Sequence, residues 1–142
     1  MKMTRRIFAL VSLIITIAIL LAIPAFAEGD REQKVINGYI LEALIYWNDN
    51  GYNADDERLI AAATTASWGG GDVDRIYAKV QIVDYYTGSL LASNERFEIN
   101  AYMASSEFAF APYGKVTIFG SAELRGPIYD YVTASCVGVG GS

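Results

Sequence analysis

Alternation of apolar and polar side chains constrains the fold of this chain more than any other feature. It is clearest between Lys115 and Arg125. Because successive side chains of a β-strand point to opposite faces of a sheet, a period of two predicts a half-buried strand with one face in the core. The predicted core face there is formed by Val116, Ile118, Ala122 and Leu124.

Four further segments have the same period. They are residues 35–47, 73–86, 96–103 and 128–135. In the second of these the predicted core face is Ile76, Ala78, Val80 and Ile82. In the third, the apolar parity is Phe97, Ile99, Ala101 and Met103, opposed by Arg96, Glu98 and Asn100.

Turn-forming residues separate these segments. Clusters of Gly, Pro, Asn and Asp at 48–51, 68–72, 86–89, 112–114 and 126–127 let the chain reverse. Strands at this spacing, without repeated helical segments, predict an all-β fold. We expect an antiparallel β-sandwich, immunoglobulin-like or jelly-roll-like.

One segment is compatible with two structures. A short helix near 54–66 would have Asn53 as its N-cap and three acidic residues in its first turn. A strand over residues 58–67 would place Ile60, Ala62, Thr64 and Ala66 on one face. The threonines favour the strand.

Residues 1–27 resemble a secretory signal peptide of the kind found in bacteria. Lys2, Arg5 and Arg6 precede an apolar run of 17 residues, and residues 25–27 offer small side chains at the −3 and −1 positions of a cleavage site. We therefore expect a secreted, extracellular protein with one domain over residues 28–142. The alternative is an uncleaved membrane anchor, for which the run is at the short limit.

Charge and composition limit the classes of partner that the protein can bind. Cleavage removes three of the 11 basic residues and none of the 16 acidic ones, which leaves a net charge of −8. Such a domain is repelled by nucleic acid and by anionic membranes, so neither is an expected partner. The single cysteine, Cys136, is expected to be a small buried apolar residue, or else to join two chains through a disulfide.

A polar stretch over residues 48–57 is rich in oxygen ligands. Asn48, Asn50 and Glu57 surround Gly51 at offsets that resemble part of an EF-hand or dockerin calcium loop. Tyr46 stands where that motif has its first Asp, and no second copy follows. A solvated polar loop is the alternative to a structural calcium site, and no other cofactor is expected.

Aromatic residues are the main candidates for ligand contact. We expect Trp47, Trp68, Tyr85 and Tyr86 to contact a ligand, because all four lie at or beside turns. Exposure is also expected at several of Tyr77, Tyr113, Tyr129 and Tyr131. The alternative is that these rings only fill strand positions, for which Tyr has a high propensity.

Catalytic patterns are missing from the sequence. The chain has no His, which excludes a Ser-His-Asp or Cys-His nucleophile pair and His-ligated metals. The carboxylate pairs Asp72/Asp74 and Glu95/Glu98 are expected to be solvated charges rather than the two acids of a cleft.

The sequence thus predicts a non-enzymatic interaction protein that binds a cell-surface or extracellular glycan or protein. Two alternatives remain open. One is a bacteriocin-like or toxin-like effector. The other is a structural subunit that assembles by strand exchange, through an edge strand or through Cys136.

Overall fold

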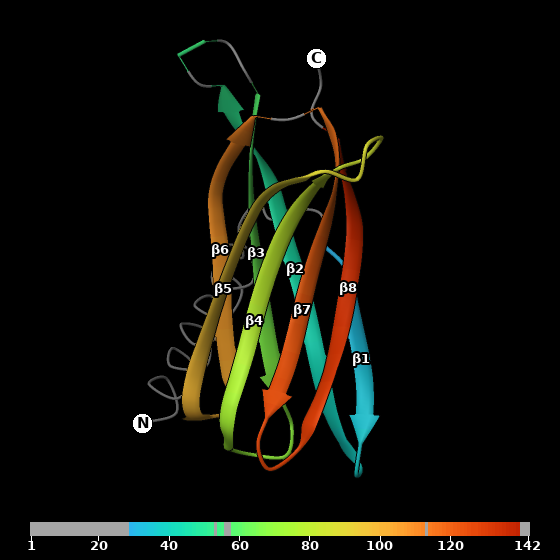
Figure 1. Cartoon of the computed structure of the whole chain (residues 1–142), viewed down its shortest axis with the longest axis vertical. Helices are drawn as coiled ribbons and strands as arrows, with labels where there is room; N and C mark the ends of the chain where they lie inside the picture. The colour runs from blue at the N-terminus through green and yellow to red at the C-terminus, as the bar shows by residue number, and fades with distance from the viewer. Residues whose placement is uncertain (1–28, 53, 56–57, 113, 140–142) are drawn as a thin grey trace, which may run out of the picture.

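Eight β-strands make up the fold in the computed structural model, which describes residues 29–52, 54–55, 58–112 and 114–139 (Figure 1). The side chains of 49–52, 58, 109–112 and 139 are also outside the description. The strands are β1 (Arg31–Ile36), β2 (Tyr39–Tyr52), β3 (Arg58–Trp68), β4 (Val73–Asp84), β5 (Leu90–Ala101), β6 (Met103–Pro112), β7 (Lys115–Arg125) and β8 (Tyr129–Val139).

The strands form two antiparallel sheets packed face to face, so the predicted β-sandwich is confirmed (Figure 1). The first sheet has the order β1-β2-β3-β6, and the second has the order β5-β4-β7-β8. Hairpins join β1 to β2, β2 to β3, β4 to β5 and β7 to β8. The chain crosses between the sheets after β3, after β5 and after β6.

The core lies between the sheets and is built from one parity of each central strand. In β4 and β7 this parity is the predicted one, because the predicted core residues of both strands are buried: Ile76, Ala78, Val80, Ile82, Val116, Ile118, Ala122 and Leu124. In β2 and β3 it comprises Leu41, Ala43, Ile45, Trp47, Ile60, Ala62, Thr64, Ala66 and Trp68. Burial of these apolar side chains is the main favourable contribution to folding.

The segment that was compatible with a helix is a strand. β3 runs from Arg58 to Trp68 and pairs with β2 on one side and β6 on the other. Ile60, Ala62 and Ala66 face the core as predicted for the strand. The helix near 54–66 is therefore wrong, because a central strand with two neighbours satisfies its backbone through ladders instead.

Two predicted boundaries in the first sheet are also wrong. Residues 35–47 are not one strand, because Asn37 and Gly38 both have positive φ and form the turn between β1 and β2. The predicted turn at 48–51 is part of β2, which continues to Tyr52 through a register shift after Asp49. A β-bulge of this kind accommodates an extra residue in one strand, and the strand continues in the same direction.

The predicted signal peptide, residues 1–27, lies outside the described residues. Among the residues that are described, no helix has the length and apolarity needed to cross a membrane.

Candidate binding surface

The outer face of the second sheet gathers aromatic and arginine side chains from all four of its strands. The register places Phe97 beside Tyr77, Tyr77 beside Glu123, and Glu123 beside Tyr131. The neighbouring row contains Ile99 beside Arg75, and Arg125 beside Tyr129. We call these residues the aromatic face: Arg75, Tyr77, Phe97, Ile99, Glu123, Arg125, Tyr129 and Tyr131.

Ring contacts hold the centre of the aromatic face. The rings of Tyr77 and Phe97 are stacked, with centroids 5.1 Å apart and planes at 29°. The guanidinium of Arg125 lies 4.1 Å from the Tyr77 centroid, and that of Arg75 lies 5.8 Å from the Phe97 centroid. Cation–π contacts of this kind fix the rings and the guanidiniums in one arrangement.

The carboxylate of Glu123 also holds the guanidinium of Arg125 in place. Nε and Nη2 of Arg125 donate to the two carboxylate oxygens of Glu123 at 2.9 and 3.0 Å. The side-chain hydrogen bond to Glu123 raises the pKa of Arg125 above its ordinary value, so the guanidinium stays charged. The bidentate geometry leaves the plane of the guanidinium over Tyr77.

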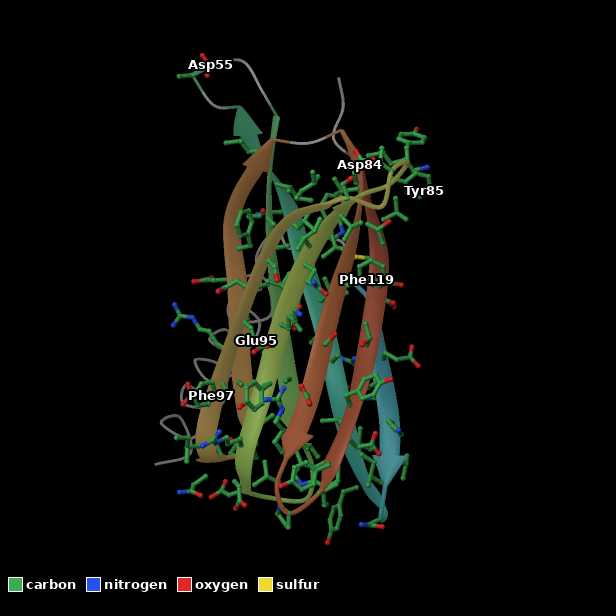
Figure 2. All side chains as sticks on the ribbon, in the orientation of Figure 1. Asp55, Asp84, Tyr85, Glu95, Phe97 and Phe119 are labelled. Carbon is green, nitrogen blue, oxygen red and sulfur yellow. The ribbon has the colours of Figure 1, made fainter. Side chains whose placement is uncertain are left out.

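Large apolar side chains of this face are open to solvent. Phe97 is 48% exposed, Ile99 59%, Tyr131 66% and Tyr129 78%, whereas Tyr77 is buried beneath its neighbours. In Figure 2 the outer face of the second sheet is turned toward the viewer, with Glu95 and Phe97 along β5 and Phe119 on β7. Exposed rings grouped on one rigid sheet are the usual mark of an interaction site.

Charge on this part of the sheet differs from that of the chain. We count the outward-facing charges between two cross-strand pairs of β4 and β5, Arg75 with Ile99 and Gln81 with Ser93, and on the adjoining part of β7. The basic side chains are Arg75, Lys79 and Arg125, and the acidic ones are Glu95 and Glu123. Their sum is +1, against −5 for the full sequence. This part of the sheet therefore carries a small positive charge that favours a ligand with hydroxyl or carboxylate groups, although the chain as a whole is acidic.

The sequence placed Phe97 and Ile99 on the wrong side of their strand. These two residues lie on the solvent side, because Phe97 pairs with Tyr77 on the outer face, whereas Ala101 of the same predicted parity packs against the core. Arg96 and Glu98 have the inner parity but reach solvent, since β5 is an edge strand whose inner face is incompletely covered. The strand also ends at Ala101, and Met103 begins β6 in the other sheet.

The turn between β4 and β5 carries two of the predicted contact residues. Tyr85 is 44% exposed and Tyr86 79%, and their rings meet edge to face at 5.2 Å. Nζ of Lys115 lies 3.7 Å from the Tyr85 centroid. The two tyrosines are exposed as predicted, but Figure 2 shows Tyr85 near one end of the sandwich and Phe97 toward the other.

The backbone of this turn is held by Asp84. Its Oδ1 accepts hydrogen bonds from the amides of Tyr86 and Thr87 and from Oγ1 of Thr87. The backbone and side-chain hydrogen bonds of Thr87, with a smaller contribution from Tyr86, lower the pKa of the Asp84 carboxyl. An Asp that accepts the amides two and three residues ahead forms a common turn motif.

Trp47 and Trp68 lie in the core instead of at the surface. Trp47 is 7% exposed and Trp68 is 4% exposed. Trp68 packs beneath Gly70, where an added Cβ would come within 2.6 Å of its Nε1, and beside Tyr39 at 5.9 Å. Neither indole face is open to a ligand, so the expected exposure of these two residues beside turns is wrong.

Only some of the residues predicted to bind calcium are among those that the structure describes. Asn48 lies in β2 with Oδ1 buried, whereas the side chain of Asn50 and all of Glu57 are outside the described residues. Within the described ranges, no three His, Cys, Asp or Glu side chains are grouped so that they could hold a metal ion. Cys136 on β8 is partly buried and packs against the core.

A hollow of about 330 Å³ lies beside β6. Ala63, Thr65, Arg96, Ser105, Ser106 and Glu107 line it. Among these residues Glu107 is the single carboxylate, and the pairs Asp72/Asp74 and Glu95/Glu98 are elsewhere. The hollow therefore does not bring together the two acids that glycoside hydrolysis needs.

Comparison with known proteins adds no assignment. No protein-family model matches the chain, and no curated protein is significantly similar to it.

Proposed function

We propose that this protein is a secreted, non-enzymatic binding protein that takes an extended extracellular glycan on the aromatic face. The observation that carries this proposal is the group of exposed rings, from Phe97 on β5 to Tyr131 on β8, on one continuous sheet. Three strand spacings separate these two residues, or roughly 14 Å. That span suits a chain of linked sugar rings.

The chemistry of the face fits sugars in two ways. Phe97, Tyr129 and Tyr131 offer apolar surface to the C–H faces of sugar rings. Arg75 and Glu123 offer donors and acceptors to hydroxyl groups in the same two rows. A site that combines apolar contact area with a few fixed polar groups is typical of small-ligand recognition.

Rigidity supports the same proposal. Phe97 and Tyr131 lie on strands that are paired along one side, and Tyr77, Phe97 and Arg125 restrain one another. A surface that is already ordered before binding loses little conformational entropy when the ligand arrives.

The test is retention of the purified protein on insoluble polysaccharides and on isolated bacterial cell walls, with and without Ca²⁺. We expect specific retention on at least one of these, and at least tenfold weaker binding for Phe97→Ala and for Tyr131→Ala. A truncated ring at a binding surface costs about 1–2 kcal/mol or more. Calcium dependence would support a site at residues 48–57.

The matched control is Tyr86→Ala, which removes another exposed ring at the β4–β5 turn. We expect Tyr86→Ala to bind as the parent does. Weakened binding for Tyr86→Ala with unchanged binding for Phe97→Ala and Tyr131→Ala would move the site to the turn. No retention on any polysaccharide or cell wall would contradict the proposed function itself.

A further inference from the structure

Four strands lie at the edges of the two sheets, and each has a row of backbone groups that no neighbouring strand pairs with. They are β1 and β6 in the first sheet and β5 and β8 in the second. A free edge can pair with another strand, so proteins protect edges with charges, prolines, irregularities or short length. The four edges here differ in how much of this protection they have.

Three of the edges are protected. β1 has only six residues, of which Arg31, Glu32 and Lys34 are charged. β5 carries Glu95, Arg96 and Glu98 and pairs with β4 through a register shift. β6 ends in Pro112, is irregularly paired with β3, and receives a hydrogen bond from Nδ2 of Asn94 to the carbonyl oxygen of Glu107 at 2.7 Å.

The β8 edge has little protection. β8 spans eleven residues, pairs with β7 without a register shift, and contains no Lys, Arg or Pro. Figure 1 shows it as the red strand at the margin of the front sheet. Its one charged residue, Asp130, forms a salt bridge with Lys34 of β1, so no unpaired charge on β8 opposes a neighbouring strand.

The hydrogen bonds define which residues face the free edge. The amide of Gly126 donates to the carbonyl oxygen of Ile128, so the even-numbered residues of β8 bond to β7. The amide of Tyr131 accordingly donates to Oδ1 of Asp130 rather than to β7. The N–H and C=O groups of Tyr131, Thr133, Ser135 and Val137 therefore point away from the sheet.

We propose that β8 pairs antiparallel with β8 of a second copy of this chain, with Ala134 opposite Ala134 of that copy. In this register Thr133 lies opposite Ser135 of the second copy, and their backbones exchange hydrogen bonds. The small Ala134 side chains meet at the two-fold axis, where the backbones come closest.

Side chains favour this register. Tyr131 of one copy lies beside Val137 of the other on the outer face, and both are exposed in the single chain, at 66% and 43%. Aromatic and β-branched residues form a favourable cross-strand pair, as do two hydroxyl residues such as Thr133 and Ser135. Each of these pairs occurs twice, because the contact is two-fold symmetric.

The dimer has two consequences. The two four-stranded sheets become one continuous sheet with both aromatic faces on the same side, and the Tyr131 residues of the two copies lie roughly 20 Å apart along the paired strands. Two linked binding faces hold a long polymer more tightly than one. Cys136 lies opposite Val132 of the second copy, so the pairing needs no disulfide.

The experiment is the mass of the purified protein by light scattering and sedimentation, over a wide concentration range and with a reducing agent present. We expect a dimer. Ser135→Pro removes an amide that faces the free edge and is tolerated in the monomer. It should weaken dimerisation about a hundredfold, since it deletes hydrogen bonds at two symmetric places. Ser135→Lys, which adds a charge to the edge, should act in the same direction.

Val35→Pro is the matched control on the β1 edge. Ile45 donates its amide to the carbonyl oxygen of Asp30, so the even-numbered residues of β1 face β2 and Val35 faces away. Val35→Pro should remain a dimer. A monomer at every concentration, or a dimer that both serine variants leave intact, would overturn the proposal. Neither outcome bears on whether a single chain binds glycan.

Discussion

At the scale of single residues, the centre of the core holds an unusual contact between a hydroxyl and a glycine. Thr64 on β3 is fully buried, and its Oγ1 has no hydrogen-bond partner in the structure. Gly120 on β7 lies opposite it, where an added Cβ would come within 2.6 Å of that oxygen. A buried hydroxyl without a partner costs free energy that a methyl group would not.

Thr64→Val should therefore stabilise the protein. We expect the free energy of unfolding to rise by about 1 kcal/mol, measured by urea denaturation. The control is Thr65→Val on the opposite face of β3, where the hydroxyl is hydrogen-bonded to Oγ of Ser105 at 3.2 Å. Thr65→Val should not stabilise. A destabilised Thr64→Val would show that the buried hydroxyl has a partner in solution.

Gly120→Ala should have the opposite effect. The added methyl group would lie 2.5 Å from Cγ1 of Ile45 as well as close to Thr64. Overpacking of this kind costs roughly 1–3 kcal/mol, to be read from the same denaturation curves. Gly114→Ala, where an added Cβ meets nothing within 4 Å, should stay within about 0.5 kcal/mol of the parent. Equal effects at the two glycines would argue against the packing seen at Gly120.

Individual residues were predictable from sequence where a strand is central and hydrophobicity alternates cleanly. Ile118 and Val80 face the core as their parity requires. Phe97 does not, because the burial of an edge strand depends on how much of it the other sheet covers. For Trp68 the error was the opposite one: it was expected at the surface but is buried, since the small Gly70 lets the backbone close over its ring.

At the scale of elements, the β4–β5 turn depends on the charge of Asp84. Hydrogen bonds from Thr87 and Tyr86 favour the ionised carboxylate and lower its pKa in the folded protein. A depressed folded pKa means that this contribution is present above the ordinary Asp range, about 4, and is lost as the pH falls through the folded pKa.

We therefore expect acidification to loosen the turn before the sheets unfold. Nuclear magnetic resonance should show the Thr87 amide shifting with a midpoint below the ordinary Asp range, while core amides such as that of Val80 stay unchanged. A midpoint at or above the ordinary pKa range of Asp would contradict the hydrogen bonds that Asp84 accepts in the structure.

Elements with strong periodicity were predictable almost to the residue. β7 has the predicted bounds, and β3 matches the strand alternative to within one residue. The turn at Asn37–Gly38 was missed although Asn-Gly is a strong hairpin signal, because the apolar alternation runs through it on both sides. The polar residues at 48–51 were taken as a turn, but a bulged strand tolerates them.

At the scale of the whole molecule, side-chain contacts join the two sheets along both of their sides. Lys34 and Asp130 join β1 to β8 on one side, and Asn94 joins β5 to β6 on the other. The aromatic face lies outside these contacts, on the second sheet. The same architecture thus supplies a surface for a ligand and a strand for a second copy.

Sequence alone could predict that exposed tyrosines exist, including Tyr129 and Tyr131, but not that they lie beside Phe97. That neighbourhood depends on the order β5-β4-β7-β8, which follows from how the chain crosses between the sheets. Local patterns carry no information on this order, because any strand with one apolar face can occupy any place in a sheet.

The most direct test of the central proposal is to map the ligand on the protein. Backbone amide shifts should be recorded while a soluble oligosaccharide of the retained polysaccharide is added. We predict that the largest changes fall on the outer rows of β4, β5, β7 and β8, around Tyr77, Phe97 and Tyr131. Changes confined to the first sheet, or to the turn at Tyr85 and Tyr86, would contradict a binding site on the aromatic face.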